Sequence, residues 1–470
     1  MGITTATTTS QQIKTASSIA FPVIMENLLM TLVSIVDTAM VGAIGAHATS
    51  AVALVASPTW VVNAAVQGAS AGCSVLVAHR VGADNWDGAR RGARESMMIG
   101  LMMGLFFLVV MELLSVHIPV WMGGEADICP LSTTYLRIVA AGYPLYIMGL
   151  VTCGAIRGAG DTSTPMRITA TANILNMILN YLLIYPAREI SISGVTMPMW
   201  GAGMGVAGAA LATAVSTAIS GFAVLIILLR RKAGLFVRLH ESFRLIRQDM
   251  SEVLEVALPA SAERLTINIG QIFYIRIISS LGTVMLAAHH IAVTAEAVSY
   301  NPGFGYQAAG TTLAGQCIGA RNERLAHRYG AISIWSGVAF MFVTGAMLII
   351  FARPFVGLFT PDQEVVKYAA VAERIAGVAQ PFFAMSIVGS GVLRGLGDAK
   401  ITIPIALLSM WAIRIPLALL FVLKLGLGLR GAWYALLIDL TLRGIVTLAR
   451  FYSGRWKKNH DWIKEKAAKV

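Results

Sequence analysis

The chain has 470 residues, of which 56% are hydrophobic and 13% charged, and its mean hydropathy is +0.71 with a formal net charge of +12. Soluble domains carry about 25% charged residues, so this composition excludes a soluble globular protein and indicates an integral membrane protein. Repeated apolar runs of about 20 residues or more predict spanning helices rather than a β-barrel.

The hydropathy pattern predicts an all-α integral membrane protein with twelve transmembrane helices. We place these spans at 16–44, 48–79, 93–118, 131–156, 165–186, 203–230, 253–280, 284–316, 331–352, 368–393, 401–424 and 430–452.

The positive charge is distributed unevenly over the connecting segments. With these spans, 25 of the 36 Lys and Arg residues lie on the same side of the membrane as the N-terminus. Because cytoplasmic loops carry the excess of basic residues, this pattern predicts that both termini are cytoplasmic. The charge therefore indicates topology, and no nucleic acid partner is expected. The polar N-terminus and the long first apolar run predict no cleavable signal peptide.

The apolar stretch from Pro22 to Gly45, which forms most of the first span, carries two carboxylates, Glu26 and Asp37. They lie close to three whole turns apart and so share one helix face. Asp37 lies roughly 22 Å along the helix from Pro22, well inside the apolar layer. An ionisable group at that depth is costly and usually marks an ion or proton pathway. The alternative is an aspartate at the outer interface that only caps or anchors the helix.

The fifth span places three amides on one helix face, at Asn173, Asn176 and Asn180. Asn180 is as far from the start of its helix as Asp37 is from Pro22. If the two helices are neighbours, Asp37, Asn176 and Asn180 can therefore meet at one level. In the alternative interpretation, the amides only hold helices together.

An internal repeat covers most of the chain. Several motifs recur 237 residues later: Pro22-x-x-x-Glu26 as Pro259-x-x-x-Glu263, Gly82-Ala83 as Gly319-Ala320, Pro144 as Pro381, and Arg157-Gly-Ala-Gly-Asp161 as Arg394-Gly-Leu-Gly-Asp398. Six spans per half predict parallel six-helix lobes related by a pseudo-two-fold axis along the membrane normal, with a central cleft between them.

The repeat also shows where the halves differ. The position that matches Asp37 is Tyr274, so we expect the ion chemistry to belong to the first half. The first half has 14 extra residues within Pro186–Gly203, where a short hairpin is expected.

The repeat divides the chain into four parts. Residues 1–229 form the N-terminal lobe and residues 252–452 the C-terminal lobe. Residues 230–251 read as a basic amphipathic helix on the cytoplasmic surface, and residues 453–470 as a cytoplasmic tail. The tail carries Trp456 and Trp462, which are expected to anchor it at the interface.

A second polar set lies in the C-terminal half. Glu296 and Arg414 each lie about 12 residues into a span, where an isolated charge is expensive. The sequence leaves three interpretations open: they pair with each other, lie in a hydrated cavity, or contact substrate. Gln67 and Tyr274 are further candidates for the lining of the cleft, together with Glu26 and Asn173.

The sequence carries none of the common enzyme signatures. The chain contains no G-x-x-x-x-G-K-[ST], HExxH, CxxC or GxSxG motif, and its four cysteines are scattered. We therefore expect a protein that is not an enzyme and needs no cofactor. No metal site is expected, although Na⁺ could bind at Asp37, Asn176 and Asn180.

These residues resemble the MATE (multidrug and toxic compound extrusion) transporter family, in its prokaryotic, DinF-like branch. The resemblance extends from about residue 16 to 452 and rests on PVIMENLL…VDTAMVG, VAHRVGA and AGQCIGA, the paired RGAGDTSTP and RGLGDAK, NPGFGYQAAGTTLAGQ and WAIRIPLA. It implies a cation-coupled antiporter that exports amphipathic, often cationic, drug-like molecules by alternating access.

The resemblance also implies roles for individual residues. The first-span aspartate, here Asp37, is the coupling carboxylate, assisted by Asn176 and Asn180. Some relatives carry an aspartate where this chain has Asn180, and the loss of that carboxylate favours H⁺ over Na⁺ as the coupling ion. The implied setting is the plasma membrane of a bacterium or archaeon, as a multi-pass monomer in the lipid bilayer.

Two other functions stay open at this point. A flippase for lipids or lipid-linked oligosaccharides, from the same superfamily, would place basic residues in the cleft, and the spans contain Arg264, Arg276, Arg414 and Arg443. A membrane scaffold or receptor is the second alternative, against which the long repeat and the buried aspartate argue.

Overall fold

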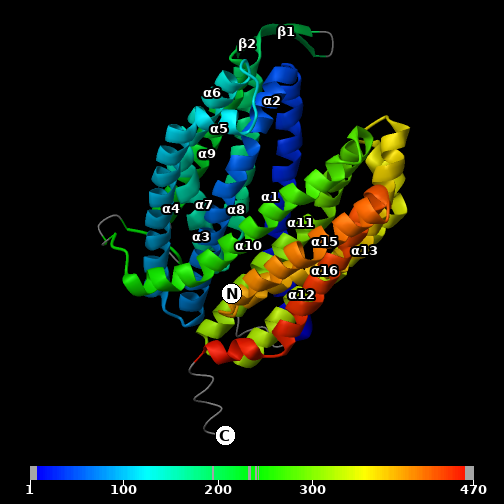
Figure 1. The fold of residues 1–470 in the computed structure, drawn as a ribbon. Helices are drawn as coiled ribbons and strands as arrows, with labels where there is room; N and C mark the ends of the chain where they lie inside the picture. The colour runs from blue at the N-terminus through cyan, green and yellow to red at the C-terminus, as the bar shows by residue number, and fades with distance from the viewer. Residues whose placement is uncertain (1–7, 193–194, 231–233, 239–240, 242, 461–470) are drawn as a thin grey trace.

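The computed structural model describes residues 8–192, 195–230, 234–238, 241 and 243–460. Figure 1 shows two helical lobes joined near one end of the molecule. Both termini lie at that end, which we call the terminus end, and a β-hairpin marks the opposite, hairpin end.

The N-terminal lobe contains the first six expected spans. Its elements are α1 (Thr9–Gly42), α2 (Ala46–Leu54), α3 (Ala56–Gly82), α4 (Trp86–Leu114), α5 (His117–Trp121), α6 (Cys129–Ala141), α7 (Tyr143–Gly158), α8 (Ser163–Ile184), β1 (Pro186–Ile192), β2 (Val195–Ala202) and α9 (Gly205–Arg230). The second span is divided into α2 and α3, and the fourth is broken into α6 and α7, which are bent by 54°.

The C-terminal lobe contains the other six. Its elements are α10 (Arg247–Ser279), α11 (Thr283–Gly319), α12 (Glu323–Gly357), α13 (Gln363–Gly395), the short 3₁₀-helix η2 (Ala399–Ile401), α14 (Thr402–Leu407), the π-helical turns η3 (Leu408–Arg414) and η4 (Leu420–Lys424) on either side of α15 (Ile415–Leu419), α16 (Gly428–Tyr452) and η5 (Arg455–Asn459). Among the described residues, eight helices are long and apolar enough to cross a membrane, or nine if the bent α6–α7 pair counts as one span.

The expected hairpin is present. Strands β1 and β2 pair in antiparallel register, with Pro186 opposite Ala202 and Ile192 opposite Val195. It occupies the extra segment that breaks the repeat, so the insertion adds a local structure without disturbing the helices on either side.

The repeat is reproduced in the local geometry of the turns. Asp84 and Arg321, 237 residues apart, both adopt a left-handed backbone, with φ of 56° and 53°. The asparagine that follows each one caps the next helix: Asn85 accepts from the backbone N–H of Gly88 at 2.8 Å, and Asn322 from that of Leu325 at 3.0 Å. An N-cap side chain of this kind satisfies an otherwise unpaired helical N–H.

The two lobes pack closely at the terminus end. Helix α3 packs along α10 and α1 along α11, the arrangement expected of two parallel repeats. A Cβ added at Gly82 would collide with the carbonyl of Gln316, and one added at Gly319 with the carbonyl of His79. The missing side chains therefore permit the close approach of α3 and α11.

Salt bridges strengthen this contact. Arg80 of α3 lies 2.7 Å from Asp249 and 3.2 Å from Glu252 of α10, and Arg91 of α4 lies 3.0 Å from Asp249. Asp249 is almost completely buried. Burial weakens the screening of such pairs by solvent, so they hold the lobes together more strongly than exposed pairs would.

The linker differs from the expectation. Its described residues 234–238, 241 and 243–246 form no helix, and α10 begins at Arg247. Leu235 and Val237 are buried in a cluster with residues of α4, α7, α8 and α9, while Phe236 lies under the guanidinium of Arg90. An extended segment can insert alternate side chains between helix ends, which satisfies the same apolar pattern.

The tail also differs from the expectation. Trp456 is fully buried and donates its indole N–H to the carbonyl of Phe451 at 3.2 Å, so it packs inside the protein rather than at the membrane interface. Trp462 lies outside the described residues.

Candidate functional site

The structure brings together the three residues expected to couple ions. Asn180 Nδ2 of α8 donates to Asp37 Oδ1 of α1 at 2.7 Å. With its amide nitrogen toward the carboxylate, Asn176 donates to both oxygens of Asp37 at 3.1 Å, and its own oxygen accepts from Thr213 N–H at 3.3 Å. The equal depth of the two helices, inferred from residue spacing, is reproduced in three dimensions.

The surroundings of Asp37 determine its chemistry. Asn176 and Asn180 are buried, whereas Asp37 is half-buried, and no basic side chain among the described residues forms an ion pair with it. Removing water from around a carboxyl group favours its neutral form, while hydrogen bonds from amide donors favour the ionised form. A carboxylate held between these opposing influences can gain or lose a proton.

The orientation of the two amides bears on the identity of the ion. Both amide nitrogens are directed at Asp37, so the site offers hydrogen-bond donors to the carboxylate. Hard cations prefer several oxygen ligands around them. Among the described residues, no group of three or more His, Cys, Asp or Glu side chains is placed to hold a metal ion. The partners that Asn176 and Asn180 offer to Asp37 are therefore amide N–H donors rather than a second carboxylate.

Asn173, on the same face of α8, does not reach Asp37. It lies one turn nearer the start of the helix than Asn176, and its Nδ2 atom is buried with no hydrogen-bond partner among the described residues.

Glu26 is engaged in a structural ion pair, contrary to its expected place in the cleft. Both of its carboxylate oxygens accept from Arg157 Nη2, at 2.8 and 2.9 Å, and Oε1 also accepts from the hydroxyl of Thr169 at 2.9 Å. One repeat later, Glu263 lies 4.0 Å from Arg394. These acids therefore bind the arginine of each R-G-x-G-D motif rather than substrate.

Glu296 and Arg414, the second polar set, do not form the ion pair that was one of the interpretations of the sequence. Arg414 does not pair with Glu296; its Nε donates to Asp439 Oδ2 at 2.6 Å. Arg443 binds the same carboxylate at 2.9 Å, and all three side chains are buried. Glu296 instead accepts from Gln380 Nε2 at 3.0 Å.

Two acids that take part in this region were missed in the sequence. Asp439 neutralises two arginines, and Glu373 is fully buried beside Glu296. The sequence did contain a signal for both acids, because each is an acidic residue inside an expected span. Asp439 also lies four residues before Arg443, on the same helix face.

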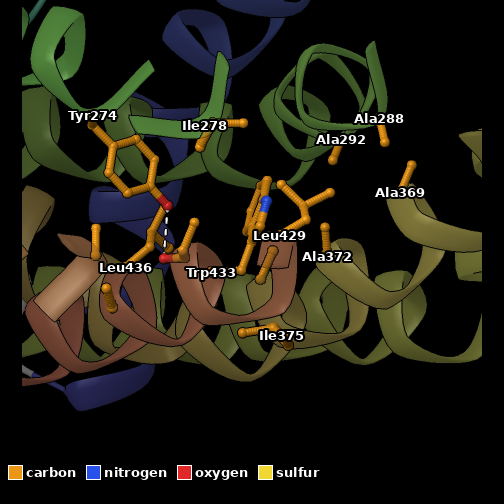
Figure 2. Packing of buried hydrophobic residues seen from close by; sticks show 14 of the residues in the cluster. Tyr274, Ile278, Ala288, Ala292, Ala369, Ala372, Ile375, Leu429, Trp433 and Leu436 are labelled. Atoms are coloured by element: carbon orange, nitrogen blue, oxygen red, sulfur yellow. Dashed lines mark hydrogen bonds between the residues drawn. The ribbon is translucent and has the colours of Figure 1, made fainter. Parts of the chain in front are cut away.

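Of the remaining candidates for the cleft, Gln67 lines a cavity and Tyr274 does not. Gln67 lines a cavity of 310 Å³ between α3 and α10. Tyr274 is fully buried in a packed cluster with Trp433 and Leu436, and its hydroxyl donates to the carbonyl of Ala432 at 2.7 Å (Figure 2). Tyr274 is thus part of the core of the C-terminal lobe, not of the cleft.

A second, apolar cavity lies close to the Asp37 site. Its volume is 480 Å³ and its walls come from α1, α8 and β2: Met40, Met177, Ile178, Tyr181, Leu182 and Met199. Flexible, polarisable methionine side chains of this kind adapt to apolar ligands of different shapes.

Comparison with known proteins gives consistent matches along the chain. The probable multidrug resistance protein NorM of Thermotoga maritima is 29% identical over 96% of this chain and 95% of its own length. The uncharacterized transporter YisQ of Bacillus subtilis is 24% identical, over 93% of this chain and 94% of its own length.

Solved structures show the same fold. A multidrug resistance MATE family transporter in an outward-facing conformation superimposes with a TM-score of 0.87 at 23% identity, covering 95% of this chain and 97% of that one. A MOP superfamily transporter from Pyrococcus furiosus, described as having a binding pocket of reverse polarity, superimposes with a TM-score of 0.86 at 23% identity, covering 94% and 95%.

The MatE family profile matches residues 22–182 and again residues 259–420, so its two matches begin one repeat apart and together cover most of the chain. This chain is therefore a membrane transporter that belongs to the MatE family.

Proposed function

We propose that this transporter is a proton-coupled multidrug antiporter that exports amphipathic, often cationic, small molecules, with Asp37 as the coupling carboxylate. The observation that carries the proposal is the contact of Asp37 with Asn176 and Asn180 at 2.7 to 3.1 Å, with no ion pair to a basic side chain in the described part of the chain. The multidrug resistance relatives support the substrate class.

The mechanism follows from the two charge states of one carboxyl group. Ionised Asp37 attracts a cationic substrate and accepts hydrogen bonds from both amides. Once Asp37 is protonated, it loses the attraction for the cation and becomes a weaker acceptor for Asn180, so α1 and α8 can repack. Substrate and proton then compete for the site, which is the requirement for antiport.

Alternating access would come from the two lobes. They are packed together at the terminus end and diverge toward the hairpin end (Figure 1). With the termini in the cytoplasm, as the basic loops predict, this conformation would face outward. Rocking of residues 1–229 against residues 252–452 would then open the opposite face. A monomer in the plasma membrane of a bacterium or archaeon is sufficient for this cycle.

The decisive experiment is transport of a fluorescent amphipathic cation, such as ethidium, in proteoliposomes that hold the full chain. Proton and sodium gradients are imposed separately. We expect transport with the proton gradient and little with sodium alone. Asp37→Asn should abolish gradient-driven transport while keeping the elution volume and melting temperature of the parent protein, and Asp37→Glu should retain part of it. Undiminished proton-driven transport in Asp37→Asn would refute the assignment.

A further inference from the structure

A polar cavity begins where the close packing of α3 and α10 ends. A Cβ added at Gly68 would collide with the side chain of Ser261 and crowd the carbonyl of Ala257, so the helices touch at this level. Nearer the start of α3, toward the hairpin end, they separate, and the 310 Å³ cavity opens between the lobes. It lies at the bottom of the inter-lobe space, where a transported molecule would be held.

The walls of this cavity have a particular polarity. Each helix contributes three polar or aromatic side chains at helical spacing: Trp60, Asn63 and Gln67 from α3, and Arg264, Asn268 and Gln271 from α10. Among the residues that the structure describes, the lining thus holds one cation, four amides and one indole, and no carboxylate. Amide side chains can hydrogen-bond to an anion through their N–H groups or to a cation through their oxygen. The full charge on the described walls is the positive charge of Arg264.

The charge on Arg264 is not neutralised by a close partner. Among the described residues, its guanidinium has no ion pair within 4.0 Å and lies over the ring of Phe304 at 5.0 Å. Two other arginines of the C-terminal lobe, Arg414 and Arg443, are both paired with Asp439. An unpaired charge inside a membrane protein is costly unless water or a ligand compensates it.

The charged groups around Arg264 leave the region positive. Glu263 precedes it on α10, but its Oε2 atom faces Arg394 at 4.0 Å, and Arg394 adds a second positive charge nearby. One acid is thus set against two arginines. The guanidinium of an arginine presents its N–H donors in a planar fork that matches the two oxygens of a carboxylate or phosphate. The ammonium group of a lysine, on its flexible side chain, matches them less well.

We infer that this inter-lobe cavity binds the anionic end, a carboxylate or phosphate, of an amphipathic aromatic substrate, with Arg264 as the anion-binding group and Trp60 as a stacking surface. The inference rests on the proposed transport function and narrows its substrate class. Compounds that carry both a cationic and an anionic group would then be accepted, because Asp37 lies on α1 and the Arg264 cavity lies between α3 and α10.

The test is equilibrium binding to the purified full chain in detergent. The probes are 1-pyrenebutyrate and its neutral amide, which share the aromatic body and differ in the carboxylate, and binding is measured by fluorescence anisotropy. We expect the wild-type protein to bind the carboxylate about tenfold more tightly than the amide, the effect of a hydrogen bond between charged groups.

Three variants assign that preference to the cavity. Arg264→Gln should remove it, and Arg264→Lys should retain part of it. Gln67→Glu should also remove it, since the new carboxylate compensates Arg264 from the opposite wall. Gln67 is exposed and nearly isosteric with Glu, so this variant keeps the test valid if Arg264→Gln fails to fold. A wild-type protein without preference for the carboxylate, or a preference that survives in both Arg264→Gln and Gln67→Glu, would overturn the inference.

Competition distinguishes two sources of the anion. Displacement of 1-pyrenebutyrate by lysophosphatidate identifies a lipid headgroup, and displacement by 2-naphthoate alone identifies a soluble carboxylate. Displacement by neither overturns the inference. Because binding requires no gradient, this result is separate from that for Asp37: proton-driven export in Asp37→Asn would refute the coupling role and leave the carboxylate preference to be decided here.

Discussion

His79 Nε2 lies 3.0 Å from the carbonyl oxygen of Gly395, and this contact joins the two lobes. Its counterpart one repeat later is the bond from Gln316 Nε2 to the carbonyl oxygen of Gly158, at 2.9 Å. His79 and Gln316 are 237 positions apart, and so are Gly158 and Gly395, so the pseudo-two-fold axis passes through the interface itself. At the terminus end, the lobes are therefore held by two symmetry-related contacts between a side chain of one lobe and a backbone carbonyl of the other.

This symmetry makes the glycines beside the contact sensitive to substitution. In Gly82→Leu or Gly319→Leu, the new side chain meets a backbone carbonyl of the opposite lobe, so we expect the closed interface to separate and transport to slow. The separation can be measured between spin labels on Asp87→Cys and Lys400→Cys, in a background without the four native cysteines.

Gly357→Ala is the matched control for these glycines, because a Cβ there meets nothing within 4 Å. Its distance distribution should equal that of the parent protein. An unchanged distribution in Gly82→Leu would show that the interface tolerates bulk and would contradict the expectation.

The two ion pairs related by the repeat should differ in strength. Glu26→Gln removes the buried carboxylate that pairs with the half-buried Arg157 at 2.8 Å and should lower the free energy of unfolding by about 3–5 kcal/mol. Glu263→Gln should cost less, since Glu263 and Arg394 are 4.0 Å apart. Chemical denaturation of both variants in one detergent measures the difference, and equal losses would show that distance does not govern these pairs.

The carboxylate of Asp439 should be a major source of stability in the C-terminal lobe. Asp439→Asn leaves two buried arginines without a negative partner, so we expect a loss of about 3–5 kcal/mol. Adding Arg443→Met removes one of the uncompensated charges and should recover part of the loss. Thermal unfolding of the single and double variants checks this, and a double variant less stable than Asp439→Asn would be the contrary result.

The coupling ion should change when an acid replaces Asn180. In Asn180→Asp, two carboxylates face each other across α1 and α8, which adds a second pair of charged oxygens to those of Asp37. We expect Na⁺ to raise the melting temperature of this variant and to leave that of the parent protein unchanged. Asn180→Leu is the control, with impaired export and no response to Na⁺. A variant Asn180→Asp that ignores Na⁺ would argue against this view of the site.

Much of the fold was predictable because its determinants are local. The lengths of the apolar runs predicted the spans. The same turn, capped by an asparagine, is present in both halves at Asn85 and Asn322. The meeting of Asp37 with Asn180 followed from equal depth in two helices that start at the same membrane face. Helical periodicity also determined which side chains share a face, as it did for Asn176 and Asn180.

Side-chain partners across helices were not predictable in the same way. Arg414 binds Asp439 rather than Glu296, and Tyr274 lies in the core rather than in the cleft. Which of several acids an arginine meets depends on how each helix is rotated about its axis and on which neighbours it packs against. Residue spacing along one chain does not specify either quantity.

The sequence by itself determined a duplicated helical membrane protein with one acid deep in its first span, because hydrophobicity and periodicity act over a few turns of helix. Only the tertiary structure decided that Glu26 pairs with Arg157, that Arg264 has no such partner among the described residues, and that the lobes pack together at the terminus end. The physical reason is that pairing and closure depend on contacts between segments more than a hundred residues apart, where packing selects one partner among several of similar chemistry.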